Sequence, residues 1–206
     1  MQRSIDHNQT SQIKRRYTLA KSQCEKILTQ LIMTVMLVIA TGNTAIAESM
    51  TSVSFNTQSG LQAVGTGTIR WFGFTIYDAS LWTGNGSFSN LEDSLPVALH
   101  ITYRKNIKSS ALAARTKEEW ERLEIYSPVE RGKWEKQLTD IWPSVKPGDS
   151  ITTLVTNDRR THFYYNNELI NSIDDPEFGI ALLSIWLHPD TSQPALRSKL
   201  IGQRDG

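Results

Sequence analysis

The stretch VALHITYR, residues 97–104, decides the fold class, because it is the clearest strand pattern in the chain and helical patterns follow it directly. The apolar and aromatic side chains at positions 97, 99, 101 and 103 fall on one face of an extended chain, and the residues between them fall on the other. This alternation predicts a β-strand with one face in the protein core.

After this strand the spacing of the apolar residues changes from alternation to that of a helix. Positions 112, 116, 120 and 123, occupied by Leu, Thr, Trp and Leu, recur at steps of four and three, which predicts a helix with Ser109 or Ser110 as its N-cap. A second helix is predicted from about Val129 to Trp142, since Pro143 cannot continue it. The strand is therefore followed by two successive helices.

Further strands are predicted on both sides of this helical block. Residues 61–83 are rich in β-branched and aromatic side chains and should form two strands joined near Trp71 to Gly73. Beyond the helices, three strands are expected at residues 151–156, 161–166 and 168–173. They should form an antiparallel meander.

Two more helices are expected after this meander. Asp174-Asp175-Pro176-Glu177 has the acidic residues and the proline that begin helices, so we assign the two aspartates to capping rather than to catalysis. A last helix is expected over residues 192–200. The blocks of strands and helices predict an α+β domain on a mainly antiparallel sheet and exclude a doubly wound nucleotide-binding fold.

The first 47 residues have a composition unlike the rest of the chain. They carry six basic and two acidic residues, whereas the other 159 residues carry 16 basic and 19 acidic ones. An apolar run at residues 27–40 follows the basic lead, and Ala45-Ile46-Ala47 follows the run, as in a secretory signal peptide. Such a run makes a helix of only about 21 Å, which is short for the roughly 30 Å hydrocarbon core of a bilayer.

We therefore predict a signal peptide at residues 1–47 that is cleaved after Ala47, a polar lead at residues 48–60 and one domain at residues 61–206. The alternatives are an uncleaved membrane anchor and an amphipathic helix inside the domain. The mature protein is expected in the periplasm, with membrane contact only during export.

The composition excludes several classes of partner and site. The chain has 22 Lys and Arg against 21 Asp and Glu, so its charge gives no reason to expect a nucleic-acid partner. The one cysteine, Cys24, lies in the predicted signal peptide, so the mature protein has no disulfide and no thiolate ligand. His100, His162 and His188 lack the spacing of a zinc site, so neither a metal nor a cofactor is expected.

Two other patterns are assigned to packing. Gly65-Thr66-Gly67-Thr68 lacks the third glycine of a phosphate-binding loop, because Arg70 stands at that position. Its small residues instead predict a strand against which another element packs closely. The six tryptophans, at positions 71, 82, 120, 134, 142 and 186, are expected in the core.

Arg70 and Arg104 are the candidate anion-binding residues, since each ends a strand of mostly apolar and hydroxyl side chains. A guanidinium group at the mouth of an apolar cavity can bind a carboxylate or a phenolate oxygen through paired hydrogen bonds. Tyr77 and Tyr103 can add hydroxyl donors. The alternative is a surface ion pair at each arginine, and the sequence leaves both interpretations open.

Five segments together have a familiar order. They are GTGTIR (65–70) followed by FTIYDASLW (74–82), YRKNI (103–107), VKPGD (145–149), FYYN (163–166), and IDDP (173–176) with IWL (185–187). Through these segments the chain resembles the chalcone isomerase-like family, in its bacterial exported branch, from about Val64 to Gly202. The resemblance implies an open-faced β-sandwich, in which helices pack over one face of a large antiparallel sheet with a ligand cleft between them.

The resemblance also implies two kinds of function. The family's plant enzymes close a chalcone to a flavanone, steered by an arginine, with a threonine and a tyrosine around a water at the ketone. Related members without enzymatic activity bind fatty acids through an arginine and a tyrosine. Arg70 and Thr75 stand at the positions of that arginine and threonine, but residues 109–142 have no counterpart of the tyrosine and asparagine that the enzymes place on a helix.

The sequence therefore predicts an exported protein that binds a small apolar or phenolic anion, such as a fatty acid. Its predicted ligand-binding residues are Arg70, Tyr77, Tyr103 and Arg104. The alternative is an isomerase of the intramolecular-lyase type, with Arg70, Thr75 and Tyr77 as catalytic residues. A second alternative is a structural or partner-binding protein of the cell envelope.

Overall fold

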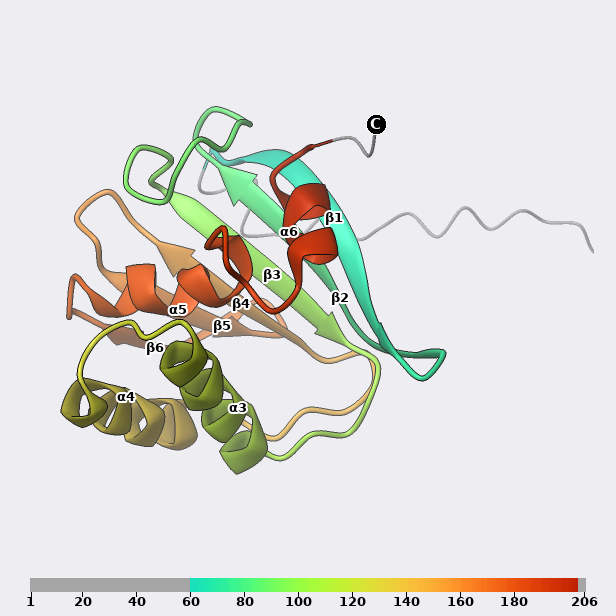
Figure 1. Cartoon of the computed structure of the whole chain (residues 1–206), viewed down its shortest axis with the longest axis vertical. Coiled ribbons are helices and arrows are strands. Elements are labelled where there is room, and N and C mark those ends of the chain that lie inside the picture. Colours follow the sequence, from blue (N-terminus) through green and yellow to red (C-terminus); the bar gives the residue numbers. More distant parts are fainter. Residues whose placement is uncertain (1–59, 204–206) are drawn as a thin grey trace, which may run out of the picture. The chain divides into compact units, whose positions relative to one another are not determined.

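The computed structural model describes residues 60–203 (Figure 1). The predictions for the signal peptide at 1–47 and for the polar lead that follows it concern residues outside this range, except for Gly60. The elements are β1 (Gln62–Trp71), β2 (Phe74–Thr83), β3 (Val97–Tyr103), α3 (Ser109–Arg122), α4 (Pro128–Ile141), β4 (Ser150–Val155), β5 (Thr161–Tyr165), β6 (Glu168–Ile173), α5 (Phe178–Leu187) and α6 (Pro194–Leu200). The predicted order of strands and helices is confirmed.

The six strands form one antiparallel sheet in which every strand pairs with its neighbours in sequence, in the order β1-β2-β3-β4-β5-β6. The helices cover one face of this sheet, with α5 across its middle and α6 across β1 and β2 (Figure 1). The predicted α+β class and the open-faced sheet are therefore confirmed. Of the helices within residues 60–203, none is long and apolar enough to cross a membrane.

The core lies between the sheet and the helices. Alternating residues of the central strands, such as Leu81, Leu99 and Phe163, are fully buried there. Trp120 on α3 and Trp134 on α4 meet edge to face at a centroid distance of 5.5 Å. This ring cluster anchors both helices over the sheet, because buried aromatic side chains remove large apolar surfaces from water.

Two glycines of β1 explain how α6 docks. A Cβ atom at Gly65 would lie 2.0 Å from the carbonyl oxygen of Lys199, and one at Gly67 would lie 2.5 Å from Cδ1 of Leu196. A Cβ atom at Gly65 would collide with the backbone of α6, whereas one at Gly67 would require the Leu196 side chain to move aside. The prediction that these small residues allow close packing is confirmed.

Several sequence predictions are wrong. Neither Ser109 nor Ser110 is the N-cap of α3, because Lys108 occupies that position and no side chain caps the helix. Trp71 is not a core residue, because 69% of its surface is exposed at the β1–β2 turn. α5 also begins later than predicted, at Phe178, and the side chain of its N-cap residue Glu177 does not cap it, although Oδ1 of Asp175 accepts from the backbone N–H of Glu177 at 3.2 Å. Asp174 instead pairs with Arg160, at an Nε–Oδ1 distance of 2.7 Å.

Candidate functional site

Tyr77 on β2 and Tyr103 on β3 lie directly opposite each other on the face of the sheet that the helices cover. Their ring centroids are 6.3 Å apart in an edge-to-face arrangement. The Tyr77 hydroxyl oxygen accepts a hydrogen bond of 3.0 Å from Nε1 of Trp186 on α5. Within residues 60–203 neither tyrosine hydroxyl donates a hydrogen bond, so both O–H groups can donate to a ligand.

Burial keeps both tyrosines protonated. Loss of solvation raises the pKa of Tyr77 to about 12, although the hydrogen bond from Trp186 acts in the opposite direction. Tyr103 is 6% exposed, and burial together with the neighbouring Tyr77 raises its pKa as well. At ordinary pH the pair therefore acts as two hydrogen-bond donors and not as a base.

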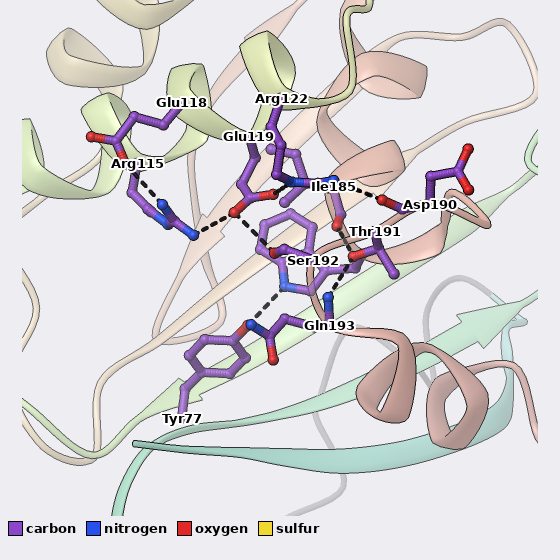
Figure 2. A network of polar contacts seen from close by, with 11 residues as sticks. Tyr77, Arg115, Glu118, Glu119, Arg122, Ile185, Asp190, Thr191, Ser192 and Gln193 are labelled. Atoms are coloured by element: carbon purple, nitrogen blue, oxygen red, sulfur yellow. Dashed lines mark hydrogen bonds and ion pairs between the residues drawn. The ribbon is translucent and has the colours of Figure 1, made fainter. Parts of the chain in front are cut away.

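A buried carboxylate on α3 lies close to this pair. Glu119 is 4% exposed, and its two oxygens accept from Arg115 and, at 2.8 Å, from Nε of Arg122 (Figure 2). The Ser192 hydroxyl donates to the same carboxylate at 2.9 Å. Glu119 raises the pKa of Tyr77 and Arg115 lowers it, so both charges act on the tyrosine.

The same network fixes the connection between α5 and α6. Arg122 donates from Nη1 to the carbonyl oxygen of Asp190 at 2.8 Å. The Thr191 hydroxyl donates to the carbonyl oxygen of Ile185 at 2.6 Å and accepts from the backbone N–H of Gln193 at 3.2 Å (Figure 2). The contact from Arg122 ties α3 to the connection between α5 and α6, and the Thr191 contacts fix the conformation of that connection.

The two predicted arginines lie on the other side of the sheet. Asp78 follows Tyr77 in β2 and so points to the opposite face, where Nε of Arg104 contacts its Oδ2 at 2.7 Å. Partial burial alone would raise the pKa of Asp78, but hydrogen bonds from Thr68 and Arg104 and the nearby charge of Arg70 lower it. At Arg104 the structure therefore shows the surface ion pair that the sequence left as the alternative.

The predicted ligand-binding residues thus form two groups with the sheet between them. Tyr77 and Tyr103 face the helices, whereas Arg104 and the exposed Arg70 lie around Asp78. Thr75 is half-buried and pairs with Arg70 across the β1–β2 hairpin, where the register shifts. The structure does not bring the four residues to one cavity.

Sequence reasoning missed Trp186, Glu119 and their arginine partners. Two signals were available in the sequence. Arg115 and Arg122 stand four residues before and three residues after Glu119, which is the spacing of helical ion pairs. Glu119 also directly precedes the stripe residue Trp120, so a carboxylate at the edge of the buried face needed a partner.

Two hollows in the described surface lie away from the tyrosine pair. One of about 430 Å³ lies between α4 and β6 and includes Lys133, Gln137 and Asp175. The other, of about 360 Å³, lies at the β1–β2 turn. Among residues 60–203 no group of three or more His, Cys, Asp or Glu side chains is arranged to hold a metal ion.

Comparisons with known proteins identify the family. The chalcone isomerase-like family model matches residues 41–202. An uncharacterized protein of Haemophilus influenzae is 25% identical over 142 residues, which cover 69% of this chain and 68% of that protein.

A solved structure shares the fold. The crystal structure of the Arabidopsis thaliana fatty-acid binding protein AtFAP1 matches with a TM-score of 0.56 and 9% identity, over 70% of this chain and 88% of that chain. At such low identity the match shows a common fold alone. Since the family model spans most of the residues and the sheet and helices agree with the solved relative, this chain belongs to the chalcone isomerase-like family.

Proposed function

We propose that this protein binds an apolar molecule with an anionic head, such as a fatty acid or a phenolic compound, between the sheet and the helices. The observation that carries the proposal is the pair of protonated hydroxyls on Tyr77 and Tyr103, neither of which donates a hydrogen bond to a described residue. A hydroxyl that donates to no protein group can donate to a ligand that binds beside it. The fold shared with a fatty-acid binding protein supports the same conclusion.

The chemistry of the head group follows from these donors. A carboxylate has two oxygens and can accept from Tyr77 and Tyr103 together, which gives charge-assisted hydrogen bonds. Arg115 on α3 adds a positive charge that lowers the pKa of Tyr77, although its partner Glu119 raises that pKa by more. The apolar part of the ligand would lie against the core side chains of the helix-covered face.

This geometry moves the predicted anion site away from Arg70. Arg70 and Arg104 lie across the sheet from the tyrosines, and Arg104 already neutralises Asp78. In this proposal the head group is held by tyrosine hydroxyls, with Arg115 as the nearby cation.

An isomerase of the intramolecular-lyase type is the second candidate, and the same tyrosine pair favours it. Two protonated phenols on neighbouring strands can donate to the negative charge that develops on a ketone oxygen. Spectrophotometric turnover of a chalcone that is lost in Tyr77→Phe would establish this activity in addition to binding.

The binding proposal is tested with the full chain produced by a bacterial host. Native mass spectrometry reports a co-purifying acid, and titration calorimetry with palmitate reports the affinity. We expect Tyr77→Phe and Tyr103→Phe each to weaken palmitate binding by about tenfold, because each removes a hydrogen bond to a charged group.

Two control variants make this experiment selective. Tyr126→Phe removes a hydroxyl that binds Glu177 at 2.9 Å outside the site, and it should leave the affinity unchanged. Arg70→Ala should also leave the affinity for palmitate unchanged if the tyrosines hold the head group. A large loss of affinity in this variant would instead show that Arg70 binds the head group. Unchanged binding in the double variant of Tyr77 and Tyr103 would refute the proposed site.

A further inference from the structure

The turn between β1 and β2 carries three aromatic side chains in solvent. Trp71, Phe72 and Phe74 are 69%, 83% and 64% exposed. They stand at a turn that projects past the layer of helices at one end of the sheet (Figure 1). We call residues 70–76 together with Lys105 the aromatic tip.

The backbone of this turn is unfavourable for its sequence. Phe72 has φ +46° and Gly73 has φ +79°, so both central residues of the two-residue turn are left-handed. A turn of this kind favours Asn-Gly, and a bulky aromatic residue at its first central position is strained. The β5–β6 turn of the same sheet has the expected chemistry, with Asn166 at +48° and Asn167 at +71°.

Phe72 therefore costs stability at a position where the fold gains little from it. Its one printed ring contact is with Trp71, at a centroid distance of 5.0 Å, and the two rings share the exposed tip. Strain that the fold does not require points to a function of the residue itself.

Two cationic side chains lie beside these rings and indicate that the tip fits an anionic surface. Nζ of Lys105 lies 4.6 Å from the ring centroid of Phe74, and Arg70 is exposed beside Trp71. Neither cation makes an ion pair with any residue that the structure describes. With Trp71, Phe72, Phe74 and Ile76, Lys105 lines the shallow hollow of about 360 Å³ at the turn.

From these observations we propose that the aromatic tip docks the protein on a lipid bilayer that contains anionic headgroups. Tryptophan and phenylalanine partition into the interface between headgroups and acyl chains, and adjacent lysine and arginine side chains pair with anionic phosphates. The occupant is a bilayer because the rings stand on a projecting turn, which can enter a soft interface without a matching pocket. The sequence predicted membrane contact only during export, and this inference adds contact by the folded domain.

Depth-dependent fluorescence quenching tests the inference directly. All six tryptophans lie within residues 60–203, and Trp71 alone among them is exposed. Vesicles of phosphatidylglycerol and phosphatidylcholine with brominated acyl chains should quench Trp71, and the quenching should disappear in Trp71→Tyr. Binding through residues 1–47 would not give this signal, since that segment contains no tryptophan.

A second variant separates docking from folding. Phe72→Asn gives the turn its preferred Asn-Gly sequence, so the folded state should be as stable as before or more stable. Removal of one inserted ring should nevertheless weaken vesicle binding by roughly tenfold. Leu169→Asn is the matched control, because Leu169 is 59% exposed on β6 at the opposite edge of the sheet and its loss should not change binding.

Lys105→Gln tests the role of charge. It should reduce binding to the anionic vesicles and leave the weaker binding to pure phosphatidylcholine unchanged. Equal binding to both kinds of vesicle by the unsubstituted chain would refute the anionic requirement. Absent quenching of Trp71, or unchanged binding in Phe72→Asn, would overturn the proposal, and so would a concentration-dependent dimer in sedimentation experiments that Phe72→Asn abolishes.

Discussion

Nε1 of Trp186 donates to the hydroxyl oxygen of Tyr77 at 3.0 Å, although 109 residues separate the two in the sequence. This hydrogen bond joins α5 to β2 and occupies one acceptor position of the phenol. The phenolic hydrogen is consequently left for another acceptor. The candidate site thus forms only when α5 has packed on the sheet.

Replacement of Glu119 should destabilise the protein. Glu119→Gln leaves Arg115 and Arg122 without a buried anion, and we expect a loss of about 2 kcal/mol in the free energy of unfolding. Urea denaturation measures this loss. Glu118→Gln is the matched control, because Glu118 pairs with the same Arg115 in solvent and should change stability by less than about 0.5 kcal/mol. Equal losses in the two variants would contradict the importance of burial.

Alanine substitutions at two glycines should change the free energy of unfolding in opposite directions, because Gly65 lies against α6 and Gly132 lies in open space. Gly65→Ala forces a Cβ atom against the backbone of Lys199 and should cost about 3 kcal/mol in unfolding free energy. Gly132→Ala lies within α4, where no atom stands within 4 Å of the added Cβ, and should stabilise by up to about 1 kcal/mol. Thermal unfolding of both variants checks the pair, and a stable Gly65→Ala protein would contradict the docking of α6.

His100 predicts a specific pH dependence of stability. Burial lowers the pKa of His100 from 6.5 to about 4. Between these values the unfolded chain binds a proton that the folded protein does not, so folding stability rises with pH across this window. We expect about 2 to 3 kcal/mol to be lost as the pH falls from 7 to 4.

Urea denaturation at several pH values measures this loss. The slope between pH 6.5 and pH 4 should be smaller in His100→Gln, whatever the stability of that variant at pH 7. A slope that is the same in both proteins would show that His100 does not titrate in this way.

The signal peptide predicted at residues 1–47 implies a defined mature protein. When the full chain is produced in a Gram-negative bacterium, the periplasmic fraction should contain a protein that begins at Glu48, as measured by intact mass and N-terminal sequencing. Leu37→Arg places a charge inside the apolar run and should leave the chain unprocessed in the cytoplasm. Full-length protein in the cytoplasm without this substitution would contradict the signal peptide.

Local patterns were sufficient to predict the fold class. Alternation identified β3, a change of period identified α3, and the bounds of most elements differ from the prediction by only one or two residues. Asp175 shows where local chemistry was not sufficient. Its Oδ1 accepts from the backbone of Glu177 at 3.2 Å, but its Oδ2 binds Nε1 of Trp134 at 3.0 Å on another helix.

The candidate site was predicted in part. The alternation of β3 already puts Tyr103 and Arg104 on opposite faces, so the sequence itself argued against one site for both. The pairing of Tyr77 with Tyr103 depends on the register of β2 and β3, which a connection of 13 residues between them does not determine. Trp186 reaches Tyr77 only after α5 has packed on the sheet, and no local pattern contains that information.

The packing of α6 on β1 also affects the order in which the protein can fold during synthesis. Each strand finds its partner in the segment made just before it, so the sheet can grow as the ribosome extends the chain. Gly65 and Gly67 of β1 face α6, which follows all the strands in the sequence. A nascent chain that lacks α6 therefore leaves this part of β1 uncovered and accessible to chaperones until α6 has been made.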